Sequence, residues 1–317
     1  MHSVNSGPAP MRRRIAIAIP ARDEADYIGA CLKRLSEMSP IGRGTSIRVI
    51  ILANNCRDAT PAIAKGFQGC FSGGLEVIER KLPRAQAHAG WARRLALDAA
   101  AASLSHSDDL LMSTDADTLV DRQWLRATLA HIDAGYDAVA GRALLNPAEL
   151  RRLPPGHRRR LGMIRRHENA LAFLRAAQRP EEPWPRHFYE GGASIALTFA
   201  AYRAVGDIPT PPVGEDKALF DAVRKTGGKV RHPMDVRVST SPRLLGRAPE
   251  GAADTLAYWA RQDEHDPIFG LRPLAAHLGA DAPHGPPLTF ANLAEETARL
   301  RALVREAREV WPLALAS

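Results

Sequence analysis

The sequence lacks the features that mark a membrane-spanning, disulfide-rich or zinc-binding chain. No apolar run approaches the about 20 residues that a membrane-spanning helix needs, and the strongest one, at 15–20, is far shorter. Only three cysteines occur, with no C-x-x-C spacing, which disfavours a disulfide framework and a zinc site. The basic first 14 residues precede no secretory apolar segment, because the run stops at Pro20. We therefore expect a cytoplasmic protein.

Two further deficits exclude classes of function. Aromatic residues make up only 6% of the chain, and no base-stacking motif occurs, so we expect no nucleic-acid partner. The turn after the first apolar run contains no glycine before Gly29, although a dinucleotide-dependent oxidoreductase needs a Gly-rich turn there. The Gly-rich, Lys-containing loop expected of a sugar-phosphate nucleotidyltransferase is missing from the same place.

The composition that is present is that of a globular protein with a basic surface. The chain has 317 residues, 45% of them hydrophobic and 25% charged, which suits one large α/β domain or two small ones. The net charge of +8 is carried mostly by arginine. Such a surface attracts phosphates in nucleic acid, nucleotides, phosphorylated sugars or anionic lipid, and composition does not choose among them.

The first half alternates short apolar runs with helical patterns, which predicts a mostly parallel sheet flanked by helices. The expected strands lie at 14–19, 47–53, 75–79, 109–113, 138–143 and 236–240. The expected helices lie at 25–38, 90–102, 124–134 and 217–226, and one more begins near Thr60, which can cap it.

The other segments predict additions to this α/β domain. We expect a disordered tail at 1–13, the domain itself at 14–243 and a mainly helical C-terminal extension at 244–317. The segment 147–185 has prolines at both ends and a basic helical middle, which indicates an insertion over one face of the domain. Within the extension, a helix is expected at 290–310.

Two aspartates directly follow the expected fourth strand. Asp115 and Asp117 are spaced by two, which places both carboxylates on one side of an extended segment. Neighbouring carboxylates repel one another unless a cation joins them, and a hard cation such as Mg²⁺ or Mn²⁺ suits oxygen ligands. The alternative is an acidic turn at which Thr118 begins the next helix.

Six short motifs resemble those of family 2 glycosyltransferases, which have the Rossmann-like GT-A fold. They occur in the family's order between about residues 14 and 243, and only their succession makes the resemblance specific. The motifs are Ile-Pro-Ala-Arg-Asp-Glu at 19–24, Leu-Ala-Asn-Asn-Cys-Arg-Asp-Ala-Thr at 52–60, Gly-Trp-Ala-Arg-Arg at 90–94, Ser-Thr-Asp-Ala-Asp at 113–117, Glu-Gly-Gly-Ala-Ser at 190–194 and Gly-Glu-Asp at 214–216.

The resemblance implies a role for each matched residue. A nucleotide-diphospho-sugar donor would be bound by Pro20, Arg22, Glu24, Asn54, Arg93, Asp115, Gly191 and Gly192. Asp117 would bind the metal, whereas Asp115 would meet either the metal or the ribose. Asp216 or Glu215 would be the catalytic base, although acidic residues are also favoured in a first helical turn. Gly191 and Gly192 would leave room for donor sugar and acceptor, or simply make a turn.

The sequence departs from the family pattern at three places. Asn54 stands where the family has Asp, and Asn-Cys follows where it has Gly-Ser. An amide still bonds a base edge but supplies no charge, which leaves the base unidentified. Arg94 stands where the family has Asn, and either binds phosphate or is solvated. The family's downstream metal-binding histidine has no clear counterpart; His232 is the nearest candidate, and a strand-end histidine without a ligand role is the alternative.

Arginines outside these motifs suggest contacts with anions. A basic cluster within 147–185 is either a solvated helix face or a surface for a phosphorylated or carboxylated acceptor or an anionic membrane; its members are Arg151, Arg152, Arg158, Arg159, Arg160, Arg165, Arg166, His157 and His167. Arg243 and Arg247 follow the last expected strand. Both arginines are expected to close over the diphosphate.

The sequence therefore predicts a metal-dependent glycosyltransferase of the hexosyltransferase type. We expect transfer from a nucleotide-diphospho-sugar to a hydroxyl of a small-molecule or lipid-linked acceptor, with Mg²⁺ or Mn²⁺ as cofactor. Inversion with Asp216 as base is the leading mechanism, and retention is the alternative. A non-enzymatic protein that uses its arginines to bind anions or a membrane surface, in peripheral contact, is the other alternative.

Overall fold

The computed structural model describes residues 13–39, 44–177, 182–246, 251–271 and 286–310. Nearly all of the tail expected at 1–13 therefore lies outside the described residues. The chain divides into two compact units. The first comprises Met1–Leu144 and Tyr189–Thr240, and the second comprises Leu145–Phe188 and Ser241–Ser317. The segment expected as an insertion thus shares a unit with the C-terminal segment.

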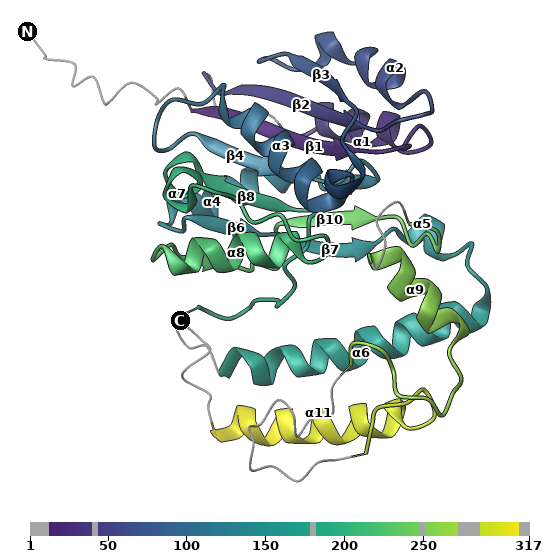
Figure 1. Cartoon of the computed structure of the whole chain (residues 1–317). Coiled ribbons are helices and arrows are strands. Elements are labelled where there is room, and N and C mark those ends of the chain that lie inside the picture. Colours follow the sequence, from purple (N-terminus) through teal and green to yellow (C-terminus); the bar gives the residue numbers. More distant parts are fainter. Residues whose placement is uncertain (1–12, 40–43, 178–181, 247–250, 272–285, 311–317) are drawn as a thin grey trace, which may run out of the picture. The chain divides into compact units, whose positions relative to one another are not determined.

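The first unit is built on a seven-stranded, mostly parallel sheet in the order β3-β2-β1-β4-β8-β6-β9 (Figure 1). Its strands are β1 Arg14–Ala21, β2 Ser46–Asn54, β3 Leu75–Arg80, β4 Leu110–Ser113, β6 Ala138–Ala140, β8 Ile195–Thr198 and β9 Val230–Arg231. Strands β3, β2, β1 and β4 run parallel, whereas β8 is antiparallel to both of its neighbours, β4 and β6. The carboxyl ends of β1, β2 and β4 therefore share one edge of the sheet.

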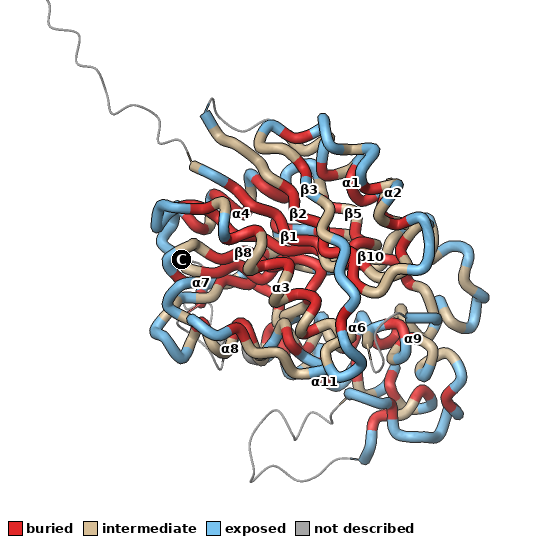
Figure 2. The backbone as a smooth tube through the Cα atoms, turned by 45° about the horizontal axis from the view of Figure 1, so that its top comes forward, coloured by how far each residue is buried: buried red, intermediate tan, exposed pale blue. Residues whose placement is uncertain are grey.

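Helices cover both faces of this sheet, which explains why its strands are continuously apolar. The helices of the unit are α1 Ile28–Ser36, α2 Thr60–Lys65, α3 Ala89–Ala101, α4 Trp124–Asp133, α7 Phe199–Val205 and α8 Glu215–Lys225, with short 3-10 turns η1 Gln68–Cys70 and η2 Arg84–Gln86. Alternate residues of β1 face opposite cores: the isoleucines at 15, 17 and 19 lie with α1 and α4, and the alanines at 16 and 18 lie with α3 and α8. Figure 2 shows these strands as the buried centre of the unit.

A second, three-stranded sheet has the order β5-β10-β7. Its strands are β5 Thr118–Val120, β7 Arg142–Leu145 and β10 Arg237–Thr240. The single strand expected at 138–143 is wrong, because β6 and β7 belong to different sheets. Gly141 lies between them, where a Cβ would stand 1.9 Å from the Ser194 hydroxyl. The helix start at Thr118, given as an alternative, is also wrong, because Thr118 begins β5.

The second unit is helical among the residues that the structure describes. It contains α5 Pro147–Leu150, α6 Pro155–Ala177, α9 Ala252–Arg261 and α11 Leu293–Val310. Helices α6 and α11 lie side by side (Figure 1) and share two small apolar clusters. Arg160 on α6 donates hydrogen bonds to the carbonyls of Trp259, Ala260 and Gln262 at the end of α9, where a cation satisfies unpaired helix carbonyls.

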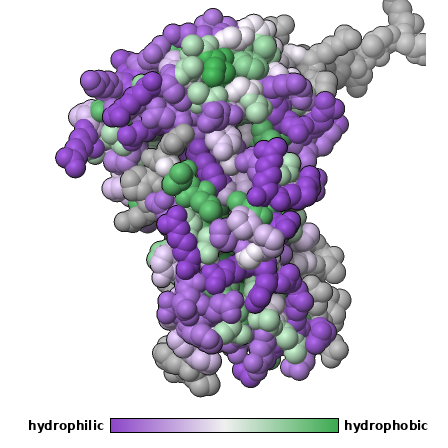
Figure 3. Space-filling view, turned by 90° about the vertical axis from the view of Figure 1, so that its right-hand side faces the viewer, coloured by the Kyte–Doolittle hydropathy of each residue, from purple (hydrophilic) through white to green (hydrophobic). Residues whose placement is uncertain are grey.

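Most of the surface visible in Figure 3 is hydrophilic. Hydrophilic side chains cover most of the face shown in Figure 3, and apolar side chains gather there in a few separate patches. None of the helices in the described part of the chain has the length and hydropathy needed to cross a membrane.

Candidate active site

The site lies in the first unit, beyond the carboxyl ends of the parallel strands. Residues 22–27 follow β1, residues 55–59 follow β2, and residues 114–117 follow β4. In open α/β sheets, ligands bind beyond these ends. Three of the six sequence motifs include these loops, and Arg93 of a fourth motif joins the remaining two to the loop after β4.

Arg93 is the centre of this site and brings four parts of the chain together. It lies in the second turn of α3, and it is only 6% exposed. Its guanidinium donates hydrogen bonds to the Asp115 carboxylate (2.8 Å), the Glu215 carboxylate (3.1 Å), the Ser113 hydroxyl (3.0 Å) and the Gly192 carbonyl (3.1 Å). The buried Arg93 guanidinium thus joins its own motif at 90–94 to the three predicted motifs at 113–117, 190–194 and 214–216.

The electrostatics of the site keep Arg93 charged. Burial alone lowers the pKa of Arg93, but the carboxylates of Asp115 and Glu215 outweigh it and raise the pKa above its ordinary value. Asp115 keeps 35% of its side chain exposed, whereas Glu215 keeps only 10%. Asp115 can therefore still meet a ligand while Glu215 is committed to Arg93.

The acidic segment after β4 is a turn rather than the extended segment that the sequence suggests. The Thr118 amide donates to the Asp115 carbonyl at 3.1 Å, which closes the turn, and β5 begins at once. The expectation that extended geometry places Asp115 and Asp117 on one side is therefore wrong. Asp117 is half-buried and lies near Cys31, whose pKa is raised by burial and then by the charges of Asp117 and Asp115. Two carboxylates hence remain close together at this edge.

Asp216 lies in the first turn of α8, next to Glu215. Its two carboxylate oxygens accept hydrogen bonds from the backbone amides of Gly192 (2.8 Å) and Lys217 (2.7 Å). Burial and the charge of Glu215 raise the pKa of Asp216, against a smaller lowering by Arg93. A carboxylate has about four lone-pair sites, so capacity to accept a proton remains after both bonds.

The glycine pair between Glu190 and β8 differs at its two positions. A Cβ on Gly192 would lie 1.9 Å from a guanidinium nitrogen of Arg93, whereas a Cβ on Gly191 would meet nothing within 4 Å. Gly192 is therefore required by the close approach of Arg93, and Gly191 faces open space. The sequence alternative of a simple turn does not account for that approach.

The loops after β1 and β2 are held together by their own polar groups. Asp23 accepts from the Arg57 amide (2.7 Å), and Asp58 accepts from the Ala25 amide (2.9 Å). Thr60 does not cap α2 as expected, because its hydroxyl accepts from the Glu24 amide and donates to Asp58. These bonds fix the loops that carry the expected nucleotide-binding residues.

Those residues occupy sheltered positions at the strand ends. Pro20 is half-buried in β1, and Glu24 and Asn54 are buried. Arg22 donates to the Ala87 carbonyl at 3.1 Å, just before α3. Asn55, which departs from the family's Gly, has a φ of 55°; asparagine tolerates this left-handed conformation. Arg243 belongs to the second unit, and its expected role stays a prediction; Arg247 lies outside the described residues.

A second, partly buried charge cluster beside the glycine pair was not predicted from the sequence. Glu190 accepts from the His232 imidazole at 3.0 Å and from Arg224 on α8. Burial raises the pKa of Glu190, but the hydrogen bonds to His232 and Arg224 outweigh this effect. The pKa of Glu190 therefore falls below its ordinary value. Glu190 precedes Gly191 and is far in sequence from its partners, which is why no local pattern links the three residues.

Two groups of residues could bind a cation. One is the pair Asp115 and Asp117. The other is Asp23, Cys56 and Asp58, whose ligand atoms lie within 4.8 Å of one another. In the second group, however, both aspartates accept loop amides and the Cys56 thiol donates to the Ala21 carbonyl. The polar atoms of that group already hold the loops together, so the pair after β4 fits a hard cation better.

Comparison with known proteins identifies the family. A family model described as "Glycosyl transferase family 2" matches residues 16–204, more than half of the chain. The chain belongs to glycosyl transferase family 2. It is accordingly a glycosyltransferase, as the six motifs predict. No curated protein sequence matches it.

Solved glycosyltransferase structures share the fold of this family member. TarS 1–349 of S. aureus, in complex with UDP-GlcNAc, has 14% identity and a TM-score of 0.54, and the match covers 94% of this chain and 73% of that one. The mannosyltransferase PcManGT of Pyrobaculum calidifontis, in complex with GDP-Man and Mn²⁺, has 18% identity and a TM-score of 0.52, covering 98% and 79%. At these identities the likeness establishes the GT-A fold alone.

Proposed function

We propose that the protein transfers a sugar from a nucleotide-diphospho-sugar to an acceptor hydroxyl with inversion, using a divalent metal and Asp216 as base. The observation that carries this proposal is the network around Arg93. It ties the acidic pair after β4 to the Glu-Asp pair of α8 and to the glycine loop. A donor-binding element, a base and an open glycine position thereby meet at one edge of the sheet.

The donor class is supported by the loops and by the relatives. The buried Asn54 amide is suited to a base edge, and Pro20, Arg22 and Glu24 enclose the same strand ends. TarS was solved with UDP-GlcNAc and PcManGT with GDP-Man. Both ligands are nucleotide-diphospho-sugars, which supports this class for the present chain without selecting the base or the sugar. We assign the diphosphate to the side of Arg93, and the expected role of Arg243 stays a prediction.

The metal is assigned to Asp117, with Asp115 as a second ligand or as the ribose contact. A bound Mg²⁺ or Mn²⁺ would supply Lewis-acid stabilisation of the departing diphosphate. Asp115 is held by Arg93 through one oxygen, Oδ1, so its orientation is fixed before a ligand arrives. Asp117 is half-buried in the same turn, and we assign direct ligation of the metal to it first.

The base is assigned to Asp216 rather than Glu215. Glu215 is 8% exposed and ion-paired with Arg93, so proton uptake there would break a buried pair. Asp216 is half-buried, and its pKa is raised by burial and by Glu215. A higher pKa makes a carboxylate a stronger base at the working pH. Glu215 then acts as a positioning residue for Arg93.

A retaining reaction on the same fold is the alternative mechanism. It would need no base on the acceptor side, so Asp216 would be dispensable for proton removal. The family match favours either enzyme over the non-enzymatic anion-binding alternative. The acceptor, small-molecule or lipid-linked, the cytoplasmic location and the peripheral membrane contact stay predictions.

A thermal-shift panel of UDP-, GDP-, ADP- and dTDP-sugars, with and without Mn²⁺, tests the donor site. We expect a metal-dependent shift with one base, lost in Asp117→Ala. Asp26→Asn is the matched control, because Asp26 is an exposed carboxylate in the loop after β1. No shift with any donor, or an equal loss in both variants, would contradict the proposal.

A further inference from the structure

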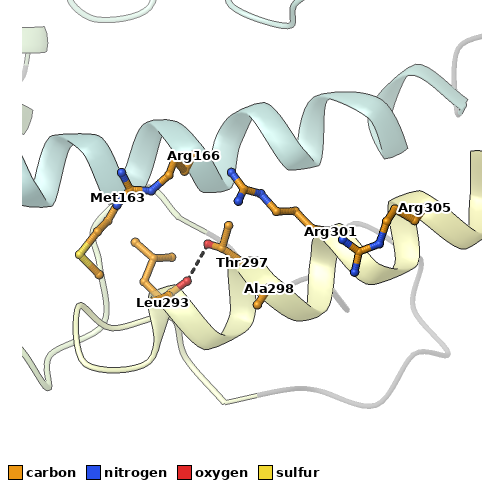
Figure 4. A pocket seen from close by; sticks show the side chains of 8 residues that line it. Met163, Arg166, Leu293, Thr297, Ala298, Arg301 and Arg305 are labelled. Carbon is orange, nitrogen blue, oxygen red and sulfur yellow. Dashed lines mark hydrogen bonds between the residues drawn. The ribbon is translucent and has the colours of Figure 1, made fainter.

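We infer that a cavity between α6 and α11 in the second unit binds the phosphate group of an amphiphilic phosphomonoester. The cavity has a volume of about 290 Å³, at the small end of the range of ligand pockets, about 300–1,000 Å³. Residues of both helices line it, among them Met163, Arg166, Leu293, Arg301 and Arg305 (Figure 4). It belongs to the second unit alone and is separate from the site around Arg93.

The rim of the cavity is cationic from both sides. Arg166 extends from α6, and Arg301 and Arg305 extend from α11 (Figure 4). All three are exposed. Among the described residues, no hydrogen bond or ion pair to any of these three guanidinium groups is found. Like charges gathered around one hollow repel each other, so the arrangement favours an anion between them.

Three carboxylates of the two helices are paired with arginines outside the cavity. Glu295 and Glu296 both pair with Arg299 on α11, at 2.6 and 2.8 Å. Glu168 on α6 pairs with Arg175 at 3.4 Å. A neighbouring arginine on α11 is thus neutralised, whereas the cavity arginines have no counter-charge among the described residues, which indicates an external anion.

The lining below the rim is apolar. Met163 is 7% exposed and Leu293 fully buried, and both belong to the apolar cluster of the unit. The Thr297 hydroxyl already donates to the Leu293 carbonyl at 2.6 Å. A ligand would therefore meet charge at the rim and hydrocarbon further in, which is the pattern that an amphiphile matches.

Phosphate fits the rim better than carboxylate does. A phosphomonoester carries about −1.5 to −2 charges near neutral pH and three acceptor oxygens, whereas a carboxylate carries one charge and two oxygens. Guanidinium groups bind phosphate oxygens through paired N–H donors. Three arginines therefore match the charge of the phosphomonoester more closely. The phosphate group could belong to a soluble metabolite or to a lipid headgroup.

Calorimetric titration of n-hexyl phosphate into the full-length protein tests the inference. Arg166→Gln and Arg301→Gln should each weaken binding about tenfold, the value of one charge-assisted hydrogen bond. Arg299→Gln, on the same helix but paired internally, should bind as the wild type does. Circular dichroism checks that all variants fold. Unchanged affinity in the first two variants, or an equal loss in Arg299→Gln, would overturn the inference.

Three further titrations define the ligand. Inorganic phosphate and heptanoate should each bind more weakly than hexyl phosphate; equal affinity for either would overturn the assignment to an amphiphilic phosphate. Co-sedimentation with phosphatidic acid vesicles, but not phosphatidylcholine vesicles, that is lost in Arg166→Gln would support a lipid source, and binding of hexyl phosphate alone would support a soluble one. Asp117→Ala should retain hexyl phosphate binding, which separates this inference from the proposed donor site.

Discussion

Arg93 in the first unit and the cavity arginines of the second unit have opposite surroundings. In the first unit, Arg93 is buried and bonded to two carboxylates, a hydroxyl and a carbonyl. In the second unit, Arg166 and Arg301 are exposed at a cavity without such partners among the described residues. A buried charge must be paired to be tolerated, whereas an exposed charge is accessible to a ligand. The contacts of Arg93 therefore organise a site, whereas Arg166 and Arg301 are exposed to an external ligand.

Removal of the buried arginine should have the largest effect. Arg93→Met leaves Asp115 and Glu215 without their cation, so we expect a loss of about 3–5 kcal/mol in the free energy of unfolding. Arg166→Met should change it by less than about 0.5 kcal/mol, because the side chain is exposed and unpaired. Urea unfolding of both variants measures the difference. Equal losses in the two variants would contradict the difference between the buried Arg93 and the exposed Arg166.

Removal of the assigned base should abolish most activity without unfolding the protein. Asp216→Asn should lower kcat about 10²–10⁴-fold while metal-dependent donor binding persists. The pKa of Asp216 is raised above its ordinary value of 3.8, so wild-type kcat should fall, as pH decreases, at a higher pH than an ordinary aspartate would give. A pH–rate profile checks this. An Asp216→Asn variant with wild-type kcat would favour the retaining alternative.

The missed cluster predicts a pH-dependent stability. The pKa of Glu190 is lowered below its ordinary value of 4.5, so its charged form stabilises the fold above that value and the stabilisation is lost as pH falls. Glu190→Gln should cost about 1.5–3 kcal/mol at neutral pH, the value of a hydrogen bond to a charged group, and flatten the acid dependence. Chemical unfolding across pH measures this. Glu79→Gln, an exposed pair with Lys65, should leave both quantities unchanged.

The smallest expected effect is a difference in stability between substitutions at Gly191 and Gly192. Gly192→Ala brings a Cβ against Arg93 and should cost about 1–3 kcal/mol through overpacking. Gly191→Ala has open space and should leave stability within about 0.5 kcal/mol of the wild type. If Gly191 borders the donor sugar, Gly191→Ala should raise the KM for the donor while stability stays unchanged. Equal stability of the two variants would contradict the close approach of Arg93.

The sequence predicts the sheet of the first unit well because its strands are buried on both faces. Ile15, Ile17 and Ile19 form a continuous apolar run with alanines, and periodicity is enough to locate it. The helix expected at 25–38 is likewise found, as α1 Ile28–Ser36. The break at Gly141 is not, because it depends on the approach of Ser194 from a distant segment. Helix α9 is also not located, since 290–310 was the one helix placed within the mainly helical extension.

The candidate site is predictable only in its parts. Motif resemblance names Arg93, Asp115, Glu215 and Gly192, and the structure brings them together. The role of Arg93 as their common partner is not visible in sequence, because its bonds span up to 122 residues. Glu190 with His232 and Arg224 is missed for the same reason, and the turn at 115–118 replaces an expected extension through a backbone hydrogen bond.

We propose that the metal lies with the nucleotide at Asp115 and Asp117, the acidic pair after β4. Electron paramagnetic resonance of Mn²⁺, titrated into the protein with the nucleoside diphosphate selected by the thermal-shift panel, tests it most directly. We predict that Asp117→Asn abolishes nucleotide-dependent Mn²⁺ binding, whereas Asp58→Asn, in the other acidic group, preserves it. Retention of Mn²⁺ in Asp117→Asn together with its loss in Asp58→Asn would contradict the account.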